Sequence, residues 1–149
     1  MALSTVELGL GTTLSYDTAV VAESYGGASW TAIAEIEEVN APGATAGEEE
    51  VTHMESATKE YIAQLTDTNE ISGTIHFLPS TYSALMTLVG TRPNHAWQIT
   101  TDDATGTVDG TYQFLGFLKS FEPQGFTAEG HRTATFSIRR SSAVTITLP

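Results

Sequence analysis

The chain contains no cysteine among its 149 residues. This absence excludes disulfides, thiolate metal ligands and cysteine nucleophiles. Basic residues are few, since six Lys and Arg stand against 18 Asp and Glu, for a formal net charge of −12. A charge of that sign argues against a groove that binds nucleic acid by neutralising phosphates. No apolar run is long enough to cross a bilayer and no basic-then-apolar signal opens the chain, so we expect no membrane partner.

Motifs that carry enzyme chemistry are also missing. The four histidines, His53, His76, His95 and His131, are scattered and form no H-x-H or H-E-x-x-H spacing. There is no G-x-S-x-G motif, no P-loop and no glycine-rich dinucleotide motif. We therefore expect no catalytic residue, no cofactor and no metal site.

What is present is strand patterning. A length of 149 residues suits one domain, 1–149, with a real core. Polar and apolar residues alternate with a period of two over 30–39, 70–77 and 133–138. Strands are also expected over 111–121, which is aromatic-rich, and over 127–139. Pro79 to Val89 predicts the single helix, with a buried face at Tyr82, Leu85, Met86 and Val89. The chain should be mainly β, a β-sandwich or barrel-forming antiparallel sheets with one flanking α-helix.

Residues 44–65 are predicted to form a long loop. They are rich in acids and lack strand alternation, yet they carry apolar residues at Val51, Met54 and 61–65. A loop of that length in a compact domain indicates function, and its apolar side chains need a surface to cover them. A second subunit would supply that surface, and residues 1–9 should form a flexible N-terminal arm.

Several segments together resemble one known family. They read E-x-V-T-H-x-E-S at 49–56, K-E-Y-I-A-Q-L at 59–65, E-x-S-G-x-I-x-F at 70–77 and G-F-L-K-S-F at 116–121. With the helix between the third and fourth, their order and spacing over 30–140 is similar to the lambda-like major tail tube proteins of long-tailed bacteriophages. The tail tubes of gene transfer agents share this likeness.

The resemblance implies a structural virion protein. Subunits of that family form hexameric rings that stack into the tail tube of a siphovirus-like particle, through which DNA passes without specific binding. Its partners would be copies of itself, the tape measure protein, the tail terminator and the tail tip or baseplate proteins. The chain would be made in the host bacterial cytoplasm and end in the virion tail. Some family members add a C-terminal immunoglobulin-like domain, which we expect to be absent here.

A wall that passes DNA should offer no phosphate anchors, because each Lys or Arg contact adds binding. Two strands carry rows of small polar residues without Lys or Arg, and acids stand on a neighbouring strand. The residues that we predict to line the channel are Glu35, Glu37, Ser72, Thr74, Thr133, Thr135 and Ser137.

Charge is distributed unevenly along the chain. Residues 35–70 hold ten acids and one Lys, whereas residues 111–149 hold two acids and four basic residues. In a head-to-tail polymer the acidic segment of one subunit would meet the basic end of another. The residues that we predict at subunit or ring interfaces are Val51, His53, Met54, Lys59, Tyr61, Ile62, Arg139 and Arg140.

Two other structural functions stay open. A tail terminator, or another protein of that lineage that forms one ring, would share the sheet-plus-helix plan and stop after one ring. A β-sandwich binding or adhesin module of the tail would show an exposed aromatic cluster on its loops, and the loops here have few aromatics besides Tyr25 and Tyr61.

Overall fold

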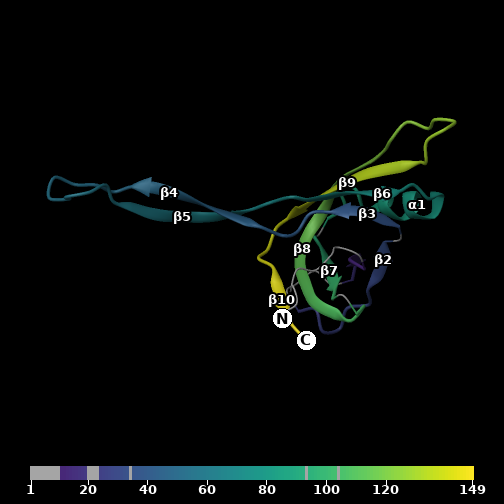
Figure 1. Cartoon of the computed structure of the whole chain (residues 1–149), viewed down its shortest axis with the longest axis horizontal. Helices are drawn as coiled ribbons and strands as arrows, with labels where there is room; N and C mark the ends of the chain where they lie inside the picture. The colour runs from purple at the N-terminus through teal and green to yellow at the C-terminus, as the bar shows by residue number, and fades with distance from the viewer. Residues whose placement is uncertain (1–10, 20–23, 34, 93, 104) are drawn as a thin grey trace, which may run out of the picture.

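The computed structural model describes residues 11–19, 24–33, 35–92, 94–103 and 105–149 (Figure 1). The predicted N-terminal arm, 1–9, lies outside these residues. The described elements are β1 Thr13–Asp17, β2 Thr31–Ile33, β3 Ile36–Val39, β4 Ala44–Glu50, β5 Tyr61–Thr68, β6 Ile71–His76, α1 Pro79–Leu88, β7 His95–Asp102, β8 Val108–Pro123, β9 Thr133–Arg140 and β10 Thr145–Thr147.

Eight of the strands form one antiparallel sheet in the order β2-β1-β7-β8-β9-β6-β3, with β10 paired to β8. The two edge strands, β2 and β3, are separated by only two residues in the chain. The edges of the sheet must therefore lie near each other, and the sheet curls around a core as a barrel-like sandwich. The predicted mainly β, antiparallel fold with one helix is confirmed.

The core lies inside this curl and draws on most strands and on the helix. Its largest fully buried side chains are Leu14, Ile71, Ile75, Leu85, Trp97, Phe114, Leu118 and Ile138. Trp97 also donates its indole N–H to the carbonyl of Gly116 at 3.2 Å, so its one polar group is satisfied. Burial of this apolar surface is the main force that holds the sheet closed.

The helix begins at Pro79, as predicted. An N–H at the first helical position has no partner within the helix, so proline, which has no N–H, is well suited to that position. Its buried residues are Leu85 and Leu88, whereas Tyr82 and Met86 are exposed and the prediction for those two residues was wrong. Tyr82 lies at the rim of the core, with its ring centroid 6.1 Å from that of Phe121. Among the described residues, no helix is both long and apolar enough to span a membrane.

The segment predicted as a loop over 44–65 is instead the greater part of a β-hairpin. Strands β4 and β5 pair antiparallel as a sheet of their own and project as a long arm from the body (Figure 1). Every residue of β4, and all of β5 except Thr68, is exposed. Alternation was absent from the sequence because neither face of this hairpin is buried within the chain.

The expected strand over 30–39 is divided in two. Glu35 has φ 57, a left-handed value that non-glycine residues rarely adopt, and it separates β2 from β3. The β3–β6 register also shifts between Ile36 and Glu38. Glu37 is the extra residue of this bulge, and its carboxylate meets His76 of β6.

Candidate functional site

A polar face covers strands β6 and β9 on the side away from the core. Ser72 pairs with Ser137, and Thr74 pairs with Thr135, as direct cross-strand neighbours. On the opposite face of these strands, Ile75 of β6 and Phe136 of β9 are buried. The alternation predicted for these strands is confirmed, and all five small polar residues share one face, the fifth being Thr133 opposite His76.

This face does carry cations, contrary to the sequence interpretation. Arg139 continues the row of Thr135 and Ser137 along β9, and its guanidinium lies 3.2 Å from a carboxylate oxygen of Asp67 in β5. Lys119 reaches across from β8 to Glu70 at 2.7 Å. Both cations are thus paired with acids, which offsets their positive charge on this face.

Glu70 is the centre of one small network on this face. It accepts hydrogen bonds from Lys119 and from the Ser137 hydroxyl, the latter at 3.0 Å. The Lys119 bond first, and then the Ser137 bond, lowers the pKa of the Glu70 carboxyl. Sequence reasoning missed this network, because the bulge between Leu118 and Ser120 that positions Lys119 leaves no pattern in the sequence.

The predicted acids Glu35 and Glu37 form a second network. Glu37 Oε1 lies 2.6 Å from His76 Nε2 and 2.9 Å from His131 Nε2. Glu35 Oε2 lies 3.3 Å from the other ring nitrogen of His76, Nδ1. The hydrogen bonds from His131 and then His76 lower the pKa of Glu37. His131 was not predicted here, because 55 residues separate it from His76 and no local motif joins them.

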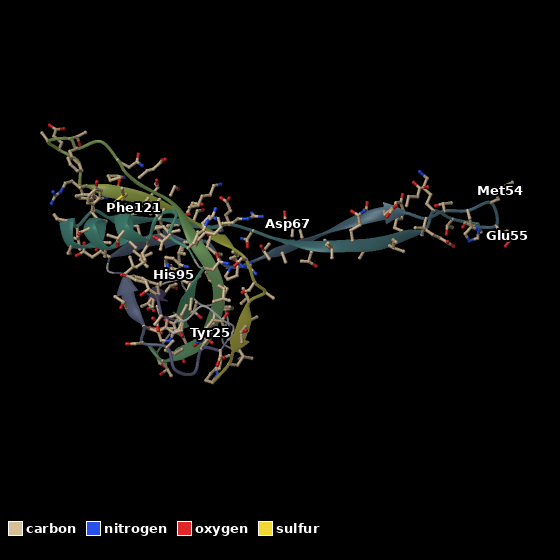
Figure 2. All side chains as sticks on the ribbon, turned by 180° about the vertical axis from the view of Figure 1, so that it is seen from behind. Tyr25, Met54, Glu55, Asp67, His95 and Phe121 are labelled. Atoms are coloured by element: carbon tan, nitrogen blue, oxygen red, sulfur yellow. The ribbon has the colours of Figure 1, made fainter. Side chains whose placement is uncertain are left out.

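The hairpin exposes large apolar side chains. Met54 is fully exposed at the tip and Leu65 is 93% exposed in β5. Figure 2 shows Met54 and Glu55 at the far end of the arm and Asp67 near its root. The predicted interface residues on this arm are all exposed, namely Val51, His53, Met54, Lys59, Tyr61 and Ile62. Leu65, which that prediction omitted, is exposed as they are.

The tip of the hairpin is held by its own hydrogen bonds. The Val51 N–H donates to the Glu60 carbonyl at 2.8 Å, and the Glu60 N–H donates to the Thr52 hydroxyl at 2.9 Å. The N–H of Ser56 donates to the His53 carbonyl at 2.9 Å. These bonds shape the tip, but they bury no apolar surface, and an isolated two-stranded hairpin is marginally stable in water.

The root of the hairpin is clamped by Arg140, which corrects the prediction that Arg140 belongs to an interface. Arg140 is only 5% exposed and lies on the core side of β9. Its guanidinium donates to the Gly43 carbonyl at 2.7 Å and to Asn69 Oδ1 at 2.9 Å. Asn69 also accepts the Gly43 N–H at 2.7 Å. The pair fixes the direction in which the arm leaves the body.

Comparisons with known proteins identify the fold. No family model and no curated protein matches this chain. A chain of the anti-feeding prophage baseplate structure, which is 6-fold symmetrised, matches with a TM-score of 0.75 at 9% identity, over 97% of both chains. The fold is tail-tube-like.

Two further structures with this tail-tube-like fold are informative. A chain of the anti-feeding prophage cap, described as a tube terminating cap, matches with a TM-score of 0.72 at 10% identity, over 100% of this chain and 95% of that one. A chain from the tail of an empty gene transfer agent particle with C6 symmetry matches with a TM-score of 0.66 at 17% identity, over 95% and 99%. At these identities the likeness establishes the fold alone.

Proposed function

We propose that this chain is a structural subunit that forms hexameric rings and that the rings stack into the tail tube of a phage or phage-like particle. The observation that carries the proposal is the projecting β4–β5 hairpin on a tail-tube-like fold. A two-stranded arm that exposes Met54, Tyr61, Ile62 and Leu65 has no cover from its own chain. Such apolar surface marks a site of protein contact.

In the proposed ring, a neighbouring subunit covers the exposed apolar side chains of the hairpin. A neighbouring subunit that packs against the hairpin buries these side chains and adds the third layer or strand that a stable sheet needs. Since Arg140 and Asn69 hold the root, the arm reaches its neighbour in a set direction, as a closed ring requires. The C6 symmetry named for the gene transfer agent tail supports six subunits per ring.

The polar face of β6 and β9 is our proposed channel wall. Its small hydroxyl side chains, and the acids Glu35 and Glu37 beside them, would keep DNA mobile because they offer few phosphate anchors. Lys119 is paired with Glu70 and Arg139 with Asp67, so these two cations would also bind DNA phosphates weakly. DNA would pass through without specific binding, and the tape measure protein would occupy the lumen during assembly.

Electron microscopy of the purified, concentrated chain tests the proposal, together with Leu65→Asp. The wild type should form tubes. Leu65 is 93% exposed, so Leu65→Asp should leave the fold unchanged by circular dichroism and reduce assembly at least about tenfold, by placing a charge in an apolar contact. Met86→Asp, at an exposed apolar residue of helix α1 on the opposite side of the body from the hairpin (Figure 1), is the matched control and should assemble. Wild-type protein that stays monomeric at all concentrations would contradict the proposal.

A terminator that forms a single ring is the second candidate, favoured by the likeness to a tube terminating cap. It shares the hairpin contact within a ring and differs in the contact between rings. Single rings that never stack, in the same electron micrographs, would select the terminator over the tube.

A further inference from the structure

Three side chains from three separate segments bring their ligand atoms to one point at the end of the polar face. Glu37 of β3, His76 of β6 and His131 of the segment between β8 and β9 each offer one atom, and these atoms lie within 4.8 Å of one another. The two imidazole Nε2 atoms approach the same carboxylate oxygen, at 2.6 and 2.9 Å. The rings stand edge to face, with centroids 5.1 Å apart.

The backbone holds two of these segments against β6. The N–H of His76 donates to the carbonyl of Glu35 at 2.9 Å, which ties β6 to the bulge that carries Glu37. The N–H of Phe77 donates to the carbonyl of Arg132 at 2.8 Å, which ties β6 to the segment that carries His131. The guanidinium carbon of Arg132 lies 5.7 Å from the ring centroid of Phe77 and 5.8 Å from that of Phe126. His131 is therefore placed over His76 by its neighbour.

A further carboxylate stands behind His76. Glu35 Oε2 lies 3.3 Å from His76 Nδ1, on the side of the ring away from Glu37. When Nδ1 carries the proton and donates it to a carboxylate, Nε2 is left free as a ligand and its basicity increases. Glu35 holds this position from a backbone with φ 57, a strained conformation of the kind that often occurs at functional sites.

We propose that Glu37, His76 and His131 bind a divalent transition metal ion such as Zn²⁺, with Glu35 as the carboxylate that orients His76. Two imidazole nitrogens and one carboxylate oxygen form a donor set that suits Zn²⁺. The fourth coordination position of the ion is then open to water or to a ligand from another subunit. Zinc–ligand bonds near 2.0–2.1 Å separate tetrahedral ligand atoms by about 3.4 Å. The present separations of 2.6 and 2.9 Å reach that value by small side-chain rotations.

The bound ion would join β3, β6 and the segment before β9, and so brace the end of the polar face. This inference rests on side-chain geometry and does not depend on the proposed tube function. It is also distinct from the hairpin contact, which lies at the other end of β6.

Calorimetric titration of the full-length chain with zinc chloride, after dialysis against a chelator, tests the site. We expect one Zn²⁺ per chain by elemental analysis, and affinity lowered at least about tenfold in His76→Ala, His131→Ala and Glu37→Gln. Glu35→Gln should weaken binding about tenfold through the orientation of His76. His53→Ala is the matched control, because His53 also faces a carboxylate, Glu60 at 3.7 Å, but no second histidine.

Trypsin cleavage after Arg132 gives a readout that is independent of affinity. Zn²⁺ should slow this cut in the wild type and leave its rate unchanged in His131→Ala, because only a ligated His131 braces the segment. The four side chains are solvent-accessible, so these variants should fold, which circular dichroism checks. No saturable Zn²⁺ binding by the wild type, or wild-type affinity in His131→Ala, would overturn the proposal.

Discussion

The environments of Arg139 and Arg140 differ because these neighbouring residues lie on opposite faces of β9. The two are adjacent in sequence and carry the same charge. Arg139 points to the polar face and pairs with Asp67, and both side chains are substantially exposed. Arg140 points inward and binds the root of the hairpin through Gly43 and Asn69. Arg139 is therefore a surface cation, whereas Arg140 is a buried residue that holds the root of the hairpin.

Leucine at each of these positions should have very different effects on stability. Arg140→Leu leaves the Gly43 carbonyl and the Asn69 amide without their buried donor, so the free energy of unfolding should fall by about 1–3 kcal/mol. Arg139→Leu removes an exposed ion pair and should cost less than about 1 kcal/mol. Urea denaturation measures both, and a larger loss in Arg139→Leu would refute this assignment of the two faces.

The Glu70 carboxyl should respond to Lys119 in a pH titration. Its folded-state pKa is lowered chiefly by the Lys119 hydrogen bond. A lowered pKa means that the ionised carboxylate contributes stability above the unfolded-state pKa, and that this contribution is lost as the pH falls through the folded-state pKa. In Lys119→Met the pKa of Glu70 should therefore rise toward its ordinary value of 4.5.

Carbon-detected nuclear magnetic resonance of the Glu70 carboxyl measures that pKa directly. Lys59→Met, at the exposed hairpin tip, removes the same charge elsewhere and should leave the Glu70 titration unchanged. Identical titrations in wild type and Lys119→Met would show that the Lys119–Glu70 contact does not persist in solution.

At the scale of elements, the hairpin is the part of the molecule whose order should depend on assembly. Its strands have hydrogen bonds to each other and almost no apolar burial. Hydrogen exchange should therefore be fast over β4, β5 and the tip in the monomer and slow in the assembled particle. Strong and equal protection of the Val51 amide in both states would contradict this, whereas β9 amides, inside the main sheet, should be protected in both.

The sequence predicted elements well where one face is buried and poorly where none is. In β6 and β9 one face packs on the core and the other faces solvent, so apolar and polar residues alternate, as in Thr74–Ile75 and Thr135–Phe136. Both strands and their faces could therefore be predicted. The helix could be located from Pro79 and its spacing of apolar residues. Strand β4, which reads ATAGEEE, carries no such signal because its apolar partners belong to the proposed neighbour rather than to this chain.

Clusters that join distant segments could not be predicted at all. His76 and His131 meet because β6 pairs with β9 and because Arg132 packs on Phe77. Glu70 and Lys119 meet across a bulge. These contacts follow from strand order and register, which alternation within single segments does not determine.

At the scale of the whole molecule, the polar face and the helix lie on opposite sides of the β6–β9 sheet. Thr74 belongs to the polar face, and the next residue, Ile75, packs in the same core cluster as Leu85 of the helix. If the polar face lines a channel, the helix must lie outside it. The natural absence of cysteine makes this testable with single-cysteine variants.

Thr74→Cys in assembled tubes should be shielded from a bulky polymer-linked maleimide that cannot enter the channel, and should react once the tubes are dissociated. Thr87→Cys, on the exposed side of the helix, is the matched control and should react in both states. The reverse pattern would place the helix inside and the polar face outside.

The most direct test of the account is a cryo-electron microscopy reconstruction of the particle that the purified chain forms. We expect six-fold rings stacked into a tube, with Ser72, Thr74, Thr135 and Ser137 on the channel wall and the β4–β5 hairpin packed against a neighbouring subunit. A reconstruction in which the hairpin contacts no other subunit, or in which this polar face points to the outside of the particle, would contradict it.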